Sequence, residues 1–228
     1  MAKENKVASE NSVEALENAL TRTEQYIESN QKSLTIIVIA IVVIIGAYLG
    51  YKKLYLAPME SEAQEQVFTA ERYFEQDSFK LALNGDGNNP GFLKLIEKYG
   101  PTKVANLSQY YAGISYRELG QYEEAIKHLK KFDASDKVIR PIALGAIGDC
   151  YVELEKYEDG ASFYKKAASY DDNNFTAPIY LLKAGVVYEK LGKYSDAVKV
   201  YETIKKDYPQ STEARDIEKY IERAKQLM

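Results

Sequence analysis

The residues that most often carry out catalysis are scarce in this sequence. Its 228 residues include one cysteine, Cys150, and one histidine, His128. A disulfide is therefore impossible within one chain, and a Cys/His zinc cluster cannot be built. We expect His128 to face outward beside Lys127, Lys130 and Lys131, and Cys150 to fill a small apolar place. No carboxylate pair stands out for acid–base work, so we predict that the chain is not an enzyme and has no catalytic residue or cofactor.

The segment "NGDGNNPG" is the one place where polar residues alternate as calcium ligands can, at Asn84, Asp86 and Asn88. An EF-hand loop also needs a glycine at its sixth place and a glutamate at its twelfth, and neither is present. Four of the eight residues are Gly or Pro, which indicates a loop. We interpret it as a structural insertion without a metal, and keep calcium- or carboxylate-dependent enzyme chemistry in residues 84–91 as an alternative.

The charge balance argues against one class of partner. Lys and Arg number 30 against 34 Asp and Glu, a formal net charge of −4. A nucleic-acid-binding protein normally shows a basic face, and none is visible in the sequence. We therefore expect no nucleic-acid partner.

The run "SLTIIVIAIVVIIGAYLGY", residues 33–51, carries no charged side chain. As a helix it is about 28 Å long at 1.5 Å per residue, close to the thickness of a bilayer core. Tyr48, Tyr51 and Tyr55 stand at one end beside two lysines, as an interfacial aromatic belt does. We predict a transmembrane anchor at 33–53 in contact with membrane lipid.

A cleaved signal peptide fits this run less well than an anchor does. Such a peptide has a short basic segment before the apolar run and a small-x-small cleavage site after it, whereas here the preceding tail is acidic and no such site follows. The positive-inside rule does not choose an orientation, because Arg22 and Lys32 balance Lys52 and Lys53. We expect Pro58 to end the membrane helix within a linker at 54–65.

Two further features suggest contacts near the membrane. Gly46 and Gly50 have the G-x-x-x-G spacing that lets another membrane helix approach closely. In the tail, residues 1–32, apolar side chains recur at spacings of three and four. This stripe either docks on a partner or belongs to a marginal solvated helix, since two heptads are too few for a stable coiled coil. Its members are Val13, Leu16, Leu20 and Ile27.

Beyond residue 100 three segments repeat each other. Their equivalent glycines are 35 and 37 residues apart, and each is followed by Tyr, Leu, a turn, another Tyr and a small residue. This period is typical of stacked helix-turn-helix units. The equivalent positions are Gly113, Gly148 and Gly185; Tyr116, Tyr151 and Tyr188; Leu119, Leu154 and Leu191; Tyr122, Tyr157 and Tyr194; and Ala125, Gly160 and Ala197.

A degenerate unit precedes the three regular ones. In "AERYFEQDSFKLAL" the residues Tyr73, Phe79 and Ala82 hold the Tyr, Tyr and Ala places, and its second helix resumes at "GFLKLIEKYG". We therefore predict an all-α fold: one transmembrane helix, then a solenoid of about four helical hairpins with a C-terminal capping helix. The expected domain is 66–228, with units at 66–102, 103–137, 138–174 and 175–210 and the cap at 211–228.

The repeats resemble the tetratricopeptide repeat (TPR). Departures are the missing Trp, replaced by Gln109, Leu144 and Leu181, and Glu155 at the turn glycine of the middle unit. In that family the first helices line a concave groove that binds partners. The resemblance implies a mostly apolar groove, filled either by a partner or by a segment of the chain itself. The matching positions are Leu107, Tyr110, Ile114, Arg117, Ile142, Gly145, Asp149, Val152, Ile179, Leu182, Val186 and Glu189.

As a whole the sequence is similar to the YfgM family of bacterial inner-membrane proteins, and "ALNGDGNNPGFL" looks like members from Bacteroidetes. The resemblance implies a single-pass inner-membrane protein with a cytoplasmic N-terminus and periplasmic repeats. It also implies partners: the Sec translocon membrane subunits, a PpiD-like anchored chaperone, and unfolded or emerging polypeptides. A TPR scaffold for another envelope assembly or division complex is the alternative.

Overall fold

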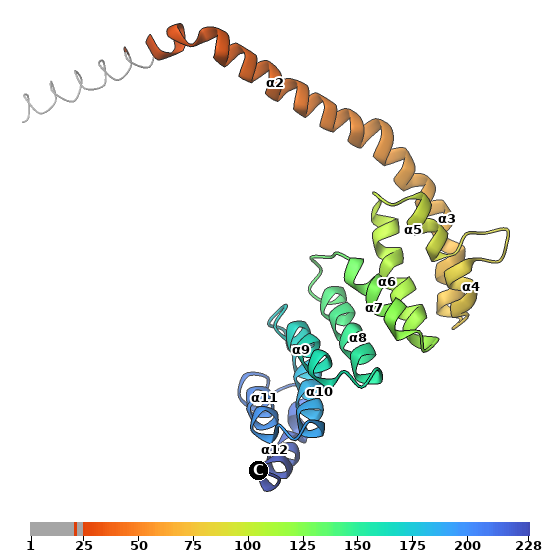
Figure 1. The fold of residues 1–228 in the computed structure, drawn as a ribbon, viewed down its shortest axis with the longest axis vertical. Coiled ribbons are helices and arrows are strands. Elements are labelled where there is room, and N and C mark those ends of the chain that lie inside the picture. Colours follow the sequence, from red (N-terminus) through yellow and green to blue (C-terminus); the bar gives the residue numbers. More distant parts are fainter. Residues whose placement is uncertain (1–20, 22–24) are drawn as a thin grey trace, which may run out of the picture. The chain divides into compact units, whose positions relative to one another are not determined.

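The computed structural model describes residue 21 and residues 25–228, and these form an all-α chain (Figure 1). The only extended pairing among the described residues is an isolated bridge between Gly85 and Pro90. The all-α prediction is therefore confirmed. Of the predicted N-terminal stripe, Val13, Leu16 and Leu20 lie outside the described residues, and Ile27 is 49% exposed in a short helical stretch.

The chain divides into two units, Met1–Ala57 and Pro58–Met228. The first contains helix α2, Gln31–Gly50, followed by a π-helical segment, Tyr51–Leu56. One 18-residue window of this helix has a mean hydropathy of 2.6, and none of it is buried. Its length and composition are sufficient for crossing a membrane or for serving as a signal sequence. A Cβ added at Gly46 or Gly50 would meet nothing within 4 Å, so this face of α2 is open.

The expectation that Pro58 ends the membrane helix was wrong. The helical backbone continues through Pro58 to the end of α3, Ala57–Glu75. Proline has no N–H, and in an α-helix its ring clashes with a carbonyl one turn earlier. Here the preceding turn is a wider π turn, in which the Ala57 N–H donates to the Lys52 carbonyl five residues back. The helix therefore accommodates Pro58 instead of stopping at it.

Residues 58–228 form consecutive helical hairpins, each packed against the next along the chain (Figure 1). In the first, α3 pairs with a second helix that is split in two; three regular hairpins and a last helix follow. The helices after α3 are α4 Phe79–Asn84, α5 Phe92–Lys98, α6 Lys103–Glu118, α7 Tyr122–Lys131, α8 Ile139–Glu153, α9 Tyr157–Ala168, α10 Ala177–Lys190, α11 Tyr194–Asp207 and α12 Ile217–Gln226, with a 3₁₀ turn at Glu213–Arg215.

The repeated glycines allow the two helices of a hairpin to touch. A Cβ at Gly113 would lie 2.5 Å from Leu129 Cγ, and one at Gly185 would lie 2.1 Å from Tyr201 Cε1. Gly148 is equivalent, with Tyr164 Cδ1 at 2.6 Å. Because real Cβ atoms do not approach this closely, glycine at these positions is what lets a large side chain of the second helix lie flat on the first.

The turn between the two helices is built in the same way in four hairpins. Gly120 and Gly192 have φ of 73° and 70°, and Asp77 and Glu155 have φ of 55° and 58° at the equivalent position. At the middle turn the Lys156 N–H donates to the Tyr151 carbonyl at 2.8 Å, which is the helix-ending bond of a Schellman motif. The left-handed conformation suits glycine and strains other residues.

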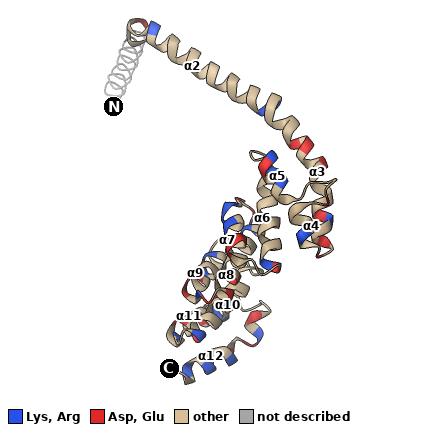
Figure 2. Ribbon diagram, turned by 45° about the vertical axis from the view of Figure 1, so that its right-hand side comes forward, with Lys and Arg blue, Asp and Glu red and all other residues tan. Residues whose placement is uncertain are grey.

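The core is divided into local clusters rather than gathered at one centre. The cluster of the first hairpin contains Phe92 and Leu95, and the last cluster joins α11 to α12 through Ile204, Ile217 and Ile221. Each cluster is shared by neighbouring hairpins, as expected for a solenoid. Acidic and basic residues are interspersed along the repeat helices, whereas α2 carries no charge after Lys32 (Figure 2).

Candidate partner-binding groove

The side chains predicted to line a groove come from α6, α8 and α10, and many of the apolar ones are taken up by packing. Leu107 and Tyr110 pack against the cluster that contains buried Ile114, and Leu182 packs against the last cluster. Gly145 is covered by the Tyr180 ring. Three positions are half-buried, Ile142, Val152 and Ile179, and Val186 is 46% exposed.

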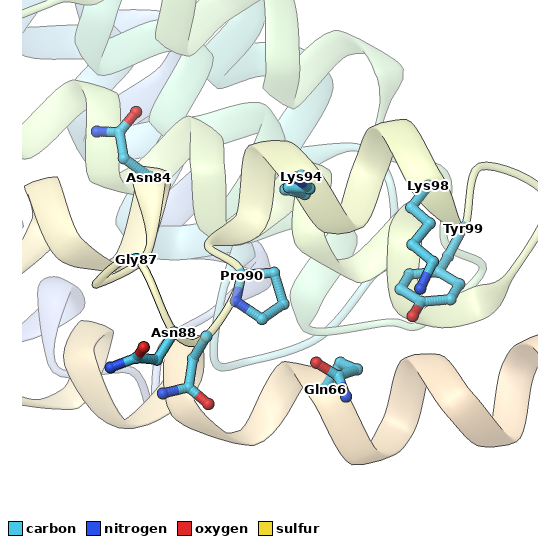
Figure 3. Close-up of a pocket in the computed structure, with 9 residues that line it drawn as sticks. Gln66, Asn84, Gly87, Asn88, Pro90, Lys94, Lys98 and Tyr99 are labelled. Atoms are coloured by element: carbon cyan, nitrogen blue, oxygen red, sulfur yellow. The ribbon is translucent and has the colours of Figure 1, made fainter.

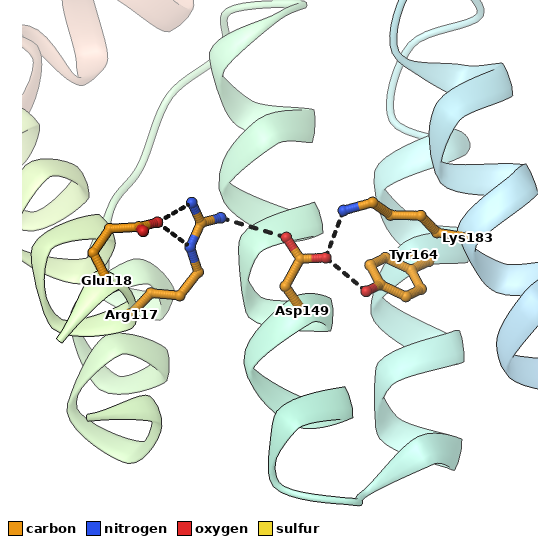
Figure 4. A network of polar contacts seen from close by, with 5 residues as sticks. All are labelled: Arg117, Glu118, Asp149, Tyr164 and Lys183. Carbon is orange, nitrogen blue, oxygen red and sulfur yellow. Dashed lines mark hydrogen bonds and ion pairs between the residues drawn. The ribbon is translucent and has the colours of Figure 1, made fainter. Parts of the chain in front are cut away.

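Polar side chains from successive hairpins meet at Asp149 on α8 (Figure 4). Lys183 Nζ on α10 donates to Asp149 Oδ1 at 2.7 Å, and Tyr164 on α9 donates its hydroxyl to the same oxygen at 2.6 Å. Arg117 on α6 reaches Asp149 Oδ2 at 3.4 Å and forms a closer pair with Glu118 at 2.6 Å. Burial and the Asp149 carboxylate raise the pKa of the Tyr164 hydroxyl far above its usual value, so Tyr164 remains a hydrogen-bond donor. The network ties α6, α8 and α10 together.

This network borders an open hollow of about 480 Å³. Two of its lining side chains are cationic, Arg117 and Lys183, and three are carboxylates. The hollow therefore offers both signs of charge beside a small apolar area, which suits a polar peptide segment better than a purely hydrophobic one. The lining residues are Arg117, Glu118, Tyr122, Asp149, Val152, Glu153, Tyr164 and Lys183.

Sequence reasoning identified Arg117 and Asp149 but missed Lys183 and Tyr164. A signal was present. Asp149 stands where the other repeats have Ile114 and Val186, and Lys183 stands where they have Tyr111 and Ala146. Two opposite charges at normally apolar places of adjacent repeats indicate a pair, and the structure shows them 2.7 Å apart.

Glu189, the last predicted groove residue, is bound by the chain itself. Arg223 on α12 donates two hydrogen bonds to its carboxylate, both at 3.0 Å, and Tyr201 donates its hydroxyl at 2.8 Å. Burial and the Glu189 carboxylate keep the pKa of Tyr201 well above its usual value. The capping helix thus covers the C-terminal end of the line of groove positions.

His128 does not face outward as predicted. Its side chain is buried, its Nδ1 lies 2.7 Å from Gln109 Oε1, and its ring stacks on Tyr116 at 5.3 Å. Burial is the main reason that its pKa is lowered, with Lys131 nearby adding to the effect. Gln109 stands at the repeat position where the sequence lacks the usual Trp.

Cys150 is fully buried on α8, where burial raises the pKa of its thiol to about 12. A thiol that stays protonated at neutral pH is a weak nucleophile. Its position agrees with the expected role as a small apolar core residue.

Asp86 organises the loop between α4 and α5. Its carboxylate accepts hydrogen bonds from the backbone N–H groups of Asn88 and Asn89, at 2.8 and 2.7 Å, and from the Tyr73 hydroxyl at 2.9 Å. The Asn89 carboxamide also donates to Asp86, at 3.0 Å, and is the main reason that the pKa of Asp86 is well below its usual value, with the other three bonds adding to the effect. Both carboxylate oxygens of Asp86 accept hydrogen bonds from the protein itself, and these bonds shape the loop. Among the described residues no group of three Asp, Glu, His or Cys side chains is arranged to hold a metal.

Comparisons with known proteins agree with this geometry. Family models described as tetratricopeptide repeat match residues 107–134, 142–174 and 180–211. Two similar solved structures are crystal structures of nearly identical TPR-like repeats from a Podosopora anserina protein described as a putative kinesin light chain, one with a single substitution. Each has a TM-score of 0.54 and 14% identity, and the match covers 74% of this chain and 87% of that chain. The search of curated proteins returned no match.

At 14% identity the similarity to these structures supports the fold and says nothing about function. The family matches fall on the hairpins α6–α7, α8–α9 and α10–α11, the ones that carry the repeated glycines. Domains of this kind bind partner proteins. The chain therefore contains tetratricopeptide repeats, in residues 107–134, 142–174 and 180–211.

Proposed function

We propose that this chain is a membrane-anchored TPR scaffold that binds partner proteins through the faces of α6, α8 and α10. The observation that carries the proposal is the hollow around Asp149, where side chains of three successive first helices converge. Val186 is exposed on α10, three residues after Lys183, which lines the hollow. A surface assembled from several repeats accepts an extended or helical segment of another protein.

The proposed anchor is α2. Its exposed apolar side chains, such as Ile36 at 67% and Ile44 at 67%, have no cover within the described chain and suit lipid. Following the resemblance to the YfgM family, we propose a single-pass inner-membrane protein with periplasmic repeats. Its partners in this proposal are Sec translocon membrane subunits, a PpiD-like chaperone and emerging polypeptides.

Site-specific photo-crosslinking in cells tests the groove and the partner together. A crosslinking amino acid at Val186, exposed on α10, is compared with one at Lys199, exposed on α11. We expect Sec subunits or a nascent chain to be captured from position 186 and not from 199. Equal capture from both positions, or capture only of division or wall-assembly proteins from 186, would contradict the proposal.

Charge reversal gives a second measurement. Lys183→Glu places a carboxylate beside Asp149 in the hollow and is expected to weaken partner capture several-fold. Lys199→Glu changes the charge by the same amount on α11, where Lys199 pairs with Asp196 at 3.0 Å, and serves as the matched control. Protease added to spheroplasts tests the orientation, since periplasmic repeats are digested and cytoplasmic ones are protected.

A further inference from the structure

A polar pocket lies in the first hairpin, where its second helix is interrupted (Figure 3). Its volume is about 290 Å³, and its walls are α3, the loop between α4 and α5, and α5 itself. Figure 3 shows Gln66 rising from α3, with Asn88 and Pro90 on the loop beside it. The lining residues are Gln66, Asn84, Gly87, Asn88, Asn89, Pro90, Lys94, Lys98 and Tyr99.

The loop wall of this pocket is held firmly in place. A Cβ at Gly85 would lie 2.2 Å from the Asn89 carbonyl oxygen, and one at Gly91 would lie 2.3 Å from the Leu83 carbonyl oxygen. The two ends of the loop are therefore in direct backbone contact, and the hydrogen bonds to Asp86 hold the residues between them. A pocket with such a wall is formed before any ligand arrives, which lowers the entropic cost of binding.

The lining side chains leave particular groups free. Within the described part of the chain, Lys94 has no ion pair, and the carboxamides of Gln66 and Asn88 make no hydrogen bond. Lys98, in contrast, is paired with Glu62 at 2.8 Å. The lining includes no Asp or Glu. One free ammonium group and two free carboxamides therefore point to a ligand with one negative charge and several neutral polar groups.

We propose that this pocket binds a monosaccharide that bears a carboxylate. Sugar hydroxyls both donate and accept hydrogen bonds, as carboxamides do, so Gln66 and Asn88 are matched to them. The Lys94 ammonium pairs with the carboxylate, and the Pro90 ring offers an apolar surface to the sugar ring. Pockets for drug-sized ligands range from about 300 to 1,000 Å³, so a pocket at the lower limit suits one sugar unit.

Isothermal titration of the full-length chain tests the proposal, in a detergent without a sugar headgroup so that the detergent does not compete. The probe is D-glucuronate; D-glucose lacks the charge, and acetate and inorganic phosphate lack the sugar ring. We expect saturable binding of D-glucuronate and at least about tenfold weaker binding of the other three, from loss of one charged hydrogen bond or of the hydroxyl contacts. No binding of D-glucuronate, or equal binding of acetate, phosphate or glucose, would overturn it.

Three variants locate the binding. Lys94→Gln and Asn88→Ala are each expected to weaken D-glucuronate binding about tenfold. Lys80→Gln removes the same charge from α4 outside the pocket and is expected to leave binding unchanged. Circular dichroism verifies that each variant is folded. Unchanged affinity in both pocket variants excludes this site. The result is independent of the protein-binding groove, because the pocket and the hollow around Asp149 share no residue.

Discussion

Lys183 Nζ lies 2.7 Å from Asp149 Oδ1, across 34 positions of sequence and between two different repeats. This contact and the Tyr164 hydroxyl make Asp149 the point where neighbouring hairpins are joined by polar groups as well as by apolar packing. Asp149 also lines the hollow of the candidate groove. A change at Asp149 is therefore expected to affect both partner binding and the stability of the repeat array.

Replacing Asp149 by alanine removes the acceptor of Tyr164 and Lys183 and leaves their polar groups without a partner. We expect Asp149→Ala to lower the free energy of unfolding by about 2 kcal/mol. Urea denaturation of the full-length chain in detergent, followed by circular dichroism, measures it. The control is Glu153→Ala, an exposed carboxylate whose contact with Tyr122 is 3.5 Å long, with an expected change below about 0.5 kcal/mol. Equal stability of the two variants would contradict the prediction.

A methyl group at Gly185 has no room, because Tyr201 is fully buried and its hydroxyl is bound to Glu189. Gly185→Ala is therefore expected to destabilise the fold by about 2 kcal/mol or more through overpacking. Gly100→Ala is the comparison, since its Cβ would meet only the Ile96 carbonyl at 3.6 Å, an ordinary contact. Thermal unfolding of both variants measures the difference in their stability. An unchanged melting temperature in Gly185→Ala would contradict the prediction and show that Tyr201 moves aside without cost.

Glu155 occupies a left-handed turn position that glycine fills in two other hairpins. Because a left-handed conformation costs an L-residue roughly 1–2 kcal/mol, Glu155→Gly is expected to raise the free energy of unfolding by about 1 kcal/mol. The reverse change, Gly192→Ala at φ 70°, is expected to lower it by a similar amount. Denaturant midpoints report both, and a lower midpoint for Glu155→Gly would disprove the strain argument.

The pH dependence of stability should report His128. Its folded pKa is lowered by burial and by Lys131, whereas the unfolded imidazole titrates near pH 6.5. The unfolded state then binds more protons, so stability is complete above about pH 6.5 and falls as the pH decreases toward the folded pKa. Melting temperatures measured from about pH 7.5 to about pH 5 should show this fall in the wild type.

In His128→Gln the fall over that range should be much smaller, because the titrating group is gone. Carboxylates such as Asp86 have lowered pKa values, so their loss of stability comes at lower pH, as they are protonated. An unchanged profile in the variant would assign the effect to another group.

The hairpins and their close contacts were predictable because the repeated Gly and Tyr positions indicate which faces of the two helices are in contact. The groove was predictable only in part. Family positions located Arg117 and Asp149, whereas Lys183 and Tyr164 come from outside that pattern and meet Asp149 only in three dimensions.

His128 was misjudged from the lysines beside it. Its spacing of three from buried Ala125 and of four from buried Phe132 places it on the inner face of α7, and that spacing was a better guide than the neighbours. Pro58 was misjudged because a proline rule for α-helices does not describe the π turn that precedes it. In both cases a local rule failed where neighbouring structure changed the environment.

The position of α12 has a consequence for synthesis on the ribosome. Ile217 and Ile221 are translated after α11, and they pack in one cluster with Tyr201 and Ile204 of that helix. Until they emerge, the growing array ends in an uncovered apolar side that invites association with other nascent chains. The apolar side of α11 is therefore covered only once α12 has been made and has folded against it.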